Sequence, residues 1–133
     1  MKIEFEVLGK PIPNVRRTAF AKKRGKVFSH LSPKTANWRA VISYTAQIEV
    51  RNQNWELTNK PVHIDLIFSF MKPKSWRKKD NIPFKKPDWE NLIKPVCDSL
   101  TGIIYTDDAR ICSWTGKKIF SDRNFVRIKI EEL

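Results

Sequence analysis

A group of acidic side chains lies between Lys86 and Ile111, in a chain that is otherwise strongly basic. The 133-residue sequence carries a formal net charge of +12, yet this window holds five of its 14 acidic residues. They are Asp88, Glu90, Asp98, Asp107 and Asp108, with Asn91 and Lys94 among them. Carboxylates gathered against the trend of the chain indicate a bound cation, and Mg²⁺ prefers oxygen ligands of this kind. A basic surface that attracts a polyanion, beside an acidic metal site, is typical of a nuclease.

The spacing of these residues suits the start of a helix expected over residues 88–100. Asp88 and Glu90 would face nearly opposite sides deep inside a helix, but both can face one site where a loop enters it. Pro87 favours an extended residue before it, which fits such a junction. Further along, one face is polar (Asn91, Lys94, Asp98) and another is apolar (Ile93, Val96, Cys97, Leu100). Gly102 is well placed to end the helix.

A plain structural interpretation of the same residues stays open. Asp88 would be a helix N-cap, Glu90 and Lys94 would form a surface ion pair four residues apart, and Asp107–Asp108 would form a turn. Pro95 adds a second choice, because proline inside a helix removes a backbone hydrogen bond. Either the helix begins later than residue 88, or it bends beside the site.

The window resembles a known family. The pattern D-x-[D/E]-N-L-x-K, a following D-x-L and a D-D pair before a strand is similar to that of RusA-type Holliday junction resolvases. The segment P-x-P-N-x-x-R, from Pro11 to Arg17, adds weaker support. The resemblance implies a homodimeric, Mg²⁺-dependent endonuclease (Mn²⁺ substituting) that cuts four-way DNA junctions in recombination and repair, often carried by a phage or prophage.

Carried over position by position, the resemblance implies a role for each acidic residue. Asp88, Glu90 and Asp108 would bind the metal, and Lys94 would be the catalytic lysine. Asn91, Asp98 and Asp107 would support them, with Asp107 the alternative to Asp108. The family has Asp where this chain has Glu90, and the extra methylene would shift a bound metal by about 1 Å, enough to affect catalysis.

Two basic segments predict the surface that binds DNA. Residues 10–39 hold nine Lys or Arg and no acid, and residues 72–86 hold seven and a single Asp80. The predicted contacts are Arg16, Arg17, Lys22, Lys23, Arg24, Lys26, Lys74, Arg77, Lys78, Lys79, Lys85 and Lys86. A solvated surface is the alternative. Aromatic residues in and around these segments (Phe20, Phe28, Trp76, Phe84) could stack on bases at an opened junction, whereas Trp76 and above all Trp89 could instead pack in a core or dimer interface.

The remaining patterns place these residues in a single domain, 1–133, of α+β class. Alternating apolar residues predict strands near residues 1–7, 62–71, 110–120 and 124–131, the second of them central and covered on much of both faces. A basic hairpin or flap turns at Gly25, and a long helix begins at Ser32–Pro33 with Trp38, Val41, Thr45 and Ile48 on one face. We therefore expect two layers, with two main helices on a mixed sheet.

Other features limit the location and the rival functions. No apolar run is long enough to span a bilayer, the first ten residues read as a strand rather than a signal peptide, and two unpaired cysteines suit a reducing compartment, so a cytoplasmic protein is expected. Zinc is not expected from two cysteines and two scattered histidines. The rivals are a non-catalytic protein that binds branched DNA and an RNA-binding protein; a junction-cleavage assay and competition with RNA hairpins separate them.

Overall fold

The computed structural model describes residues 1–21 and 26–133, and for residues 16–21 and 26–29 it describes the backbone alone. The chain forms a two-layer α+β fold. Its elements are β1 (Lys2–Leu8), β2 (Arg16–Ala21), β3 (Lys26–Leu31), α1 (Pro33–Asn52), β4 (Val62–Met71), α2 (Trp89–Leu100), a 3₁₀ turn η1 (Asp108–Arg110), β5 (Ile111–Ser121) and β6 (Phe125–Glu132). The predicted class and the order of the elements are confirmed.

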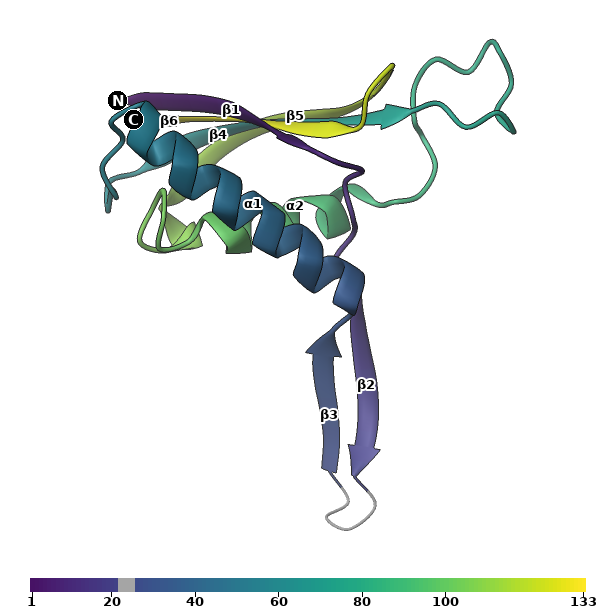
Figure 1. Cartoon of the computed structure of the whole chain (residues 1–133), viewed down its shortest axis with the longest axis horizontal. Helices are drawn as coiled ribbons and strands as arrows, with labels where there is room; N and C mark the ends of the chain where they lie inside the picture. The colour runs from purple at the N-terminus through teal and green to yellow at the C-terminus, as the bar shows by residue number, and fades with distance from the viewer. Residues whose placement is uncertain (22–25) are drawn as a thin grey trace.

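Four strands form one mixed sheet in the order β1–β6–β4–β5. Only the β4–β5 pair is parallel, and β6 pairs antiparallel with both β1 and β4. Both helices lie on the same side of this sheet (Figure 1). The core therefore lies between the sheet and the helices, and α2 is held beneath β4 and β5.

The β4 strand is central, as predicted, but only one of its faces is fully covered. Val62, Ile64, Leu66, Phe68 and Phe70 are all buried toward the helices. On the opposite face His63, Asp65 and Ile67 are half-buried, and no described helix covers them (Figure 1). The expectation of cover on much of both faces is therefore only partly right, because neighbouring strands shield the second face without a packed layer.

The α1 helix begins where the sequence predicts, but it buries a different face. Ser32 is the N-cap, and its hydroxyl accepts from the Thr35 backbone N–H at 3.2 Å. The buried residues are Thr35, Trp38, Ile42 and Ala46. Of the predicted face only Trp38 is buried, since Val41 and Ile48 are 45% and 41% exposed and Thr45 is half-buried. Small side chains at Thr35 and Ala46 allow close packing, and tertiary contacts thus override the apolar pattern.

The β2–β3 hairpin projects away from the helical layer (Figure 1). Its strands pair antiparallel from Arg16–Leu31 to Ala21–Lys26, which confirms the predicted hairpin. The predicted turn at Gly25 lies outside the described residues. At the base, the Ser32 N–H donates to the Val15 carbonyl at 2.8 Å, and the Thr35 hydroxyl donates to the Pro13 carbonyl at 2.9 Å. These bonds attach the hairpin to the start of α1.

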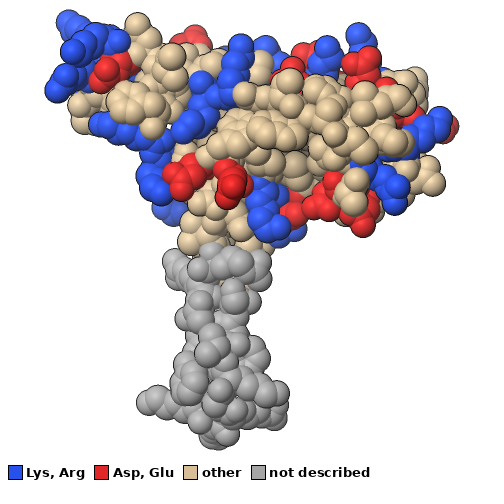
Figure 2. Space-filling model, turned by 180° about the vertical axis from the view of Figure 1, so that it is seen from behind, with Lys and Arg blue, Asp and Glu red and all other residues tan. Residues whose placement is uncertain are grey.

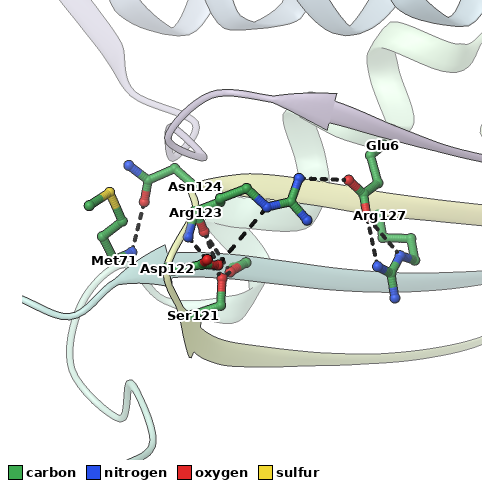
Figure 3. A network of polar contacts seen from close by, with 8 residues as sticks. Glu6, Met71, Ser121, Asp122, Arg123, Asn124 and Arg127 are labelled. Carbon is green, nitrogen blue, oxygen red and sulfur yellow. Dashed lines mark hydrogen bonds and ion pairs between the residues drawn. The ribbon is translucent and has the colours of Figure 1, made fainter.

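A turn at residues 122–124 crosses the end of β4 and fixes the start of the loop that follows (Figure 3). The Asn124 side-chain oxygen accepts from the Met71 backbone N–H at 2.8 Å, and the Asn124 backbone carbonyl accepts from the Gly9 N–H at 3.0 Å. Arg123 and Arg127 both contact the Glu6 carboxylate, at 3.4 and 2.6 Å (Figure 3). The first strand, the last strand and the exit of β4 are thereby joined at one place.

Residues 72–87, which include the basic segment 72–86, form an irregular loop that leads directly into α2. This loop extends beyond the end of the sheet (Figure 1). Within the described part of the chain, no helix combines the length and the apolar character that crossing a membrane would require.

Candidate active site

The α2 helix begins at Trp89, and Asp88 is its N-cap residue. The Asp88 carboxylate makes no capping hydrogen bond; it lies 2.8 Å from the Lys86 ammonium instead. Asp88 therefore occupies the N-cap position, as the plain structural interpretation has it, but its side chain does not cap the helix. Val96, Cys97 and Leu100 are buried and Ile93 packs against the core, so the predicted apolar face is confirmed. Gly102 has a φ of +82° just past the helix end, as expected of a C-terminal glycine.

Pro95 lies within α2, so the helix does not begin after it. Proline has no N–H, and the carbonyl four residues earlier, that of Asn91, therefore lacks its helical partner. The Asn14 backbone N–H donates to this carbonyl at 2.7 Å. Pro95 thus leaves the Asn91 carbonyl free to accept a hydrogen bond from Asn14, in the segment before the basic hairpin.

Trp89 anchors the first turn of α2, as the sequence reading of a packed residue favoured. Its ring packs edge-on against Phe68, with centroids 5.4 Å apart, and stacks on Trp114 at 5.6 Å. A Cβ atom at Gly116 would overlap the same indole ring, so glycine is what lets the ring lie on β5. Because Trp89 stands between Asp88 and Glu90, its packing sets where both carboxylates lie.

Four of the predicted site residues line one cavity of ≈ 330 Å³. They are Glu90, Lys94, Asp98 and Asp108, over an apolar wall that includes Ile64, Leu66, Ile93, Cys97 and Trp114. Among the described residues, the ion pair on this helix joins Lys94 to Asp98 at 3.5 Å, and the alternative Glu90–Lys94 pair does not form. Lys94 remains 58% exposed and so can still reach a substrate.

The adjacent aspartates Asp107 and Asp108 have different roles. Asp107 accepts from the Ala109 N–H at 2.8 Å and caps η1, and this bond lowers its pKa. A hydrogen bond with Asp107, partial desolvation and the charges of Asp107 and Asp98 raise the pKa of Asp108. Asp108 lines the cavity, which favours it over Asp107 as the residue that faces the site.

Asp88 and Asn91 line a separate, larger cleft of ≈ 890 Å³. Five lysines border the cleft and Asp88 is its single acid; the lysines are Lys10, Lys34, Lys85, Lys86 and Lys118. The predicted set of Asp88, Glu90 and Asp108 is therefore divided between two neighbouring hollows. In residues 1–21 and 26–133, no three His, Cys, Asp or Glu lie close enough together to hold a metal ion.

The predicted DNA contacts are only partly described. Lys22, Lys23 and Arg24 lie outside the described residues, and the side chains of Arg16, Arg17, Phe20, Lys26 and Phe28 are likewise outside the description. Lys74, Arg77, Lys78, Lys79, Lys85 and Lys86 are exposed. Lys and Arg gather at the end of the molecule formed by the 72–87 loop (Figure 2). The positive charge of the 72–87 loop thus lies beside the cleft.

Trp76 organises this loop. It packs edge-on against Phe84 and Phe120, with both centroid distances 5.1 Å, and the Lys85 ammonium lies 4.6 Å from its ring centroid. Trp76 therefore packs within the protein, whereas Phe84 is 64% exposed. Sequence reasoning missed Lys118, whose ammonium donates to the Lys85 and Pro87 carbonyls, at 3.0 Å each. Its alternation with Gly116 and Phe120 along β5 was the available signal.

Comparison with known proteins assigns the family. The model of the endodeoxyribonuclease RusA family matches residues 9–131. The chain belongs to the RusA family of endodeoxyribonucleases. It is similar to the crossover junction endodeoxyribonuclease rusA of Lactococcus phage r1t, with 29% identity over the whole of both chains. It is also 27% identical to the uncharacterized protein YqaN of Bacillus subtilis strain 168, over 98% of this chain and 96% of YqaN. As a member of this family, the chain described here is an endodeoxyribonuclease.

RusA nucleases depend on a metal ion in general, and the residues of the ≈ 330 Å³ cavity fit such an ion. Glu90, Asp98 and Asp108 all line this cavity but do not lie close enough together for all three to hold one ion, and the charge of Asp98 contributes to the raised pKa of Asp108. Mg²⁺ is usually held by only one or two carboxylates, with water and substrate oxygens completing its shell. A cavity with acids on α2 and η1 meets that requirement without a closed protein cage.

Proposed function

We propose that this RusA-family enzyme resolves four-way DNA junctions in the cytoplasm, in recombination and repair, by Mg²⁺-dependent hydrolysis of phosphodiester bonds. The observation that carries the proposal is the shared cavity of Glu90, Lys94, Asp98 and Asp108, which opens next to a cleft bordered by five lysines. The acidic side chains supply metal ligands, and the lysines supply charge for a phosphate backbone.

The positions of the residues support the following proposed roles. Glu90 and Asp108, which line the cavity, would hold the metal, and Asp88, the residue before α2, would contribute a further carboxylate. When bound, Mg²⁺ would lower the pKa of a water and neutralise charge on the phosphate. Lys94, exposed at the cavity mouth, neutralises charge that develops on the phosphate oxygens. Asp98 orients the Lys94 ammonium, and Asn91 and Asp107 support the neighbouring backbone.

We further propose that DNA lies along the 72–87 loop and the basic hairpin. The exposed lysines and arginines of the loop would bind phosphates, which fixes position without reading sequence. Phe84, exposed at the loop surface, would meet unstacked bases at the junction centre. A homodimer suits a substrate that needs two symmetric cuts, because one two-fold axis then relates both active sites.

A cleavage assay tests this proposal. Purified protein is incubated with a synthetic four-way junction and a linear duplex of the same sequence, with Mg²⁺, Mn²⁺ or a chelator. We expect paired nicks in opposite strands of the junction, intact linear duplex, and no cutting with chelator. Cutting of linear duplex at the same rate, or cutting that persists with chelator, would contradict the proposal.

A further inference from the structure

One row of β5 side chains faces the helices and contacts the segment that leads into α2. Trp114, Gly116, Lys118 and Phe120 alternate along the strand, and they stand beside Ile64, Leu66, Phe68 and Phe70, the buried face of β4. Each of the four touches part of residues 76–89. β5 is an edge strand of the four-stranded sheet. The side chains on its helix-facing side make these contacts.

Lys118 binds the backbone immediately before Asp88. Its ammonium donates to the carbonyls of Lys85 and Pro87, both at 3.0 Å. Lys118 is half-buried, which makes these charge-assisted bonds stronger than they would be in water. Two bonds to carbonyls two residues apart fix the path of the chain up to Asp88.

Gly116 and Trp114 hold the residue immediately after Asp88. The Trp89 ring stacks on Trp114 with an interplanar angle of 23° and occupies the space that a Cβ atom at Gly116 would need. The carbonyl of Leu66 is 3.1 Å from that Cβ position, so the neighbouring strand would crowd an added methyl group as well. The indole position is thus set by the strand.

Asp88 needs this support because its own side chain does not bind the helix. It makes no capping bond, and its ion pair with Lys86 joins two exposed side chains, which fixes geometry weakly. We propose that Lys118 and Gly116 are positioning residues of the nuclease: they hold Pro87 and Trp89 against β5 and thereby place Asp88 and Glu90 for metal-dependent cutting. This inference rests on the proposed function of those two acids.

The first test uses Gly116→Ala and Trp89→Leu, singly and together. The added methyl group must displace the indole, and a shift of about 1 Å at a catalytic group costs on the order of 100-fold in rate. We expect Gly116→Ala to lower the turnover of junction cutting at least about tenfold, while the protein stays folded and its junction Kd changes less than about twofold. In the Trp89→Leu background the same methyl group should have almost no further effect, because the overlap is gone.

The second test compares Lys118→Met with Lys117→Met. The two changes remove the same charge from neighbouring residues, but Lys117 is exposed on the opposite face of β5. We expect Lys118→Met to lower turnover about tenfold, Lys117→Met to leave it unchanged, and Lys118→Arg to recover part of the rate. Amide hydrogen exchange, measured without DNA or metal, should become faster in residues 85–92 for Lys118→Met and Gly116→Ala only.

The exchange measurement separates this inference from the proposed function. Suppose that the wild-type protein cuts no junction while Lys118→Met and Gly116→Ala still exchange faster than wild type at residues 85–92. In that case the proposed function fails and the positioning contact stands. If the wild type cuts and Lys118→Met matches Lys117→Met in both turnover and exchange, the positioning role is overturned. Wild-type turnover in a folded Gly116→Ala protein overturns it as well.

Discussion

Neighbouring acidic residues in this site differ in what surrounds them. Asp107 binds a backbone N–H and caps a 3₁₀ turn, whereas Asp108 faces the cavity that Glu90 and Lys94 share. Asp88 lies across α2 in the cationic cleft, paired with Lys86. A carboxylate can take part in the reaction only if it is not already used to cap the backbone. Single substitutions test which of these carboxylates take part.

Asp88→Asn removes one carboxylate charge and keeps the shape of the side chain. We expect junction cutting to fall on the order of 100-fold, because loss of a metal ligand weakens both metal binding and water activation. Junction binding should be equal or tighter, since a negative charge next to phosphates is lost. Gel-shift and cleavage assays measure the two effects, with Asp80→Asn as a control of equal charge. Wild-type cutting by Asp88→Asn would remove Asp88 from the site.

Lys94→Ala separates chemistry from affinity. We expect turnover to fall about 100-fold while the Kd for the junction changes little, because the ammonium acts on charge that develops in the transition state. Losing the exposed Lys94–Asp98 pair should change the free energy of unfolding by less than about 1 kcal/mol. Lys79→Ala, in the loop, should instead weaken binding and spare turnover. Equal losses of binding and turnover in Lys94→Ala would mark the lysine as a phosphate contact alone.

At the scale of elements, a proline in α2 links the site to the hairpin. Pro95 leaves the Asn91 carbonyl without a helical donor, and Asn14 supplies one from the segment before β2. Asn14, within the Pro11–Arg17 motif, is therefore bonded to the helix that carries Glu90 and Lys94. The β2–β3 hairpin inherits its direction from this contact and from the bonds to Ser32 and Thr35.

Asn14→Pro removes the backbone donor, whereas Asn14→Ala removes only the side chain. We expect Asn14→Pro to lower the free energy of unfolding by about 1 kcal/mol and to weaken junction binding severalfold, because the Asn91 carbonyl loses its partner and the hairpin its fixed base. Asn14→Ala should behave as wild type. Urea unfolding and gel shifts check both variants. If both variants behave as wild type, the hydrogen bond from the Asn14 N–H does not matter. If both lose stability and binding equally, the Asn14 side chain is responsible.

The β1–β6 pair carries a pH-dependent contribution to stability. A hydrogen bond from Arg127, with the charges of Arg123 and Arg127, lowers the pKa of Glu6 below its ordinary value of 4.5 (Figure 3). A lowered pKa in the folded state stabilises the fold above pH 4.5 and loses that effect as the pH falls through the folded value. Glu6→Gln should therefore cost about 0.5 kcal/mol at pH 7 and nearly nothing in strong acid. Urea titrations over that range measure this; a constant difference would contradict it.

At the scale of the whole molecule, charge is distributed unevenly. Five lysines border the cleft and the exposed loop beside it is basic (Figure 2), whereas Asp88 lines the cleft itself and Glu90, Asp98 and Asp108 line the neighbouring cavity. Such a distribution brings a polyanion to the surface and places its backbone near the carboxylates. We therefore expect recognition by phosphate charge and junction shape rather than by base contacts.

Binding should therefore depend steeply on salt. Each phosphate contact adds about 0.9 to the slope of log affinity against log salt, so several contacts give a large slope. Lys34→Ala, at the edge of the cleft, should reduce that slope by about one contact. Four-way junctions should compete better than linear duplex of the same sequence. Gel-shift titrations at several salt concentrations provide the measurement, and a flat response or equal competition would exclude junction recognition by charge and shape.

The features that the sequence by itself determined depend on interactions between residues that are close together in the chain. Ser32 caps α1 through a neighbouring N–H, alternation gives β4 its full length, and the grouped acids mark the site in a basic chain. Tertiary structure decided the rest: the buried face of α1, the separation of Asp88 from Asp108, the fit of Trp89 on Gly116 and the bonds from Lys118 to Pro87. These contacts join residues that are 20 or more positions apart. Their geometry depends on how the layers pack, and no pattern of nearby residues encodes it.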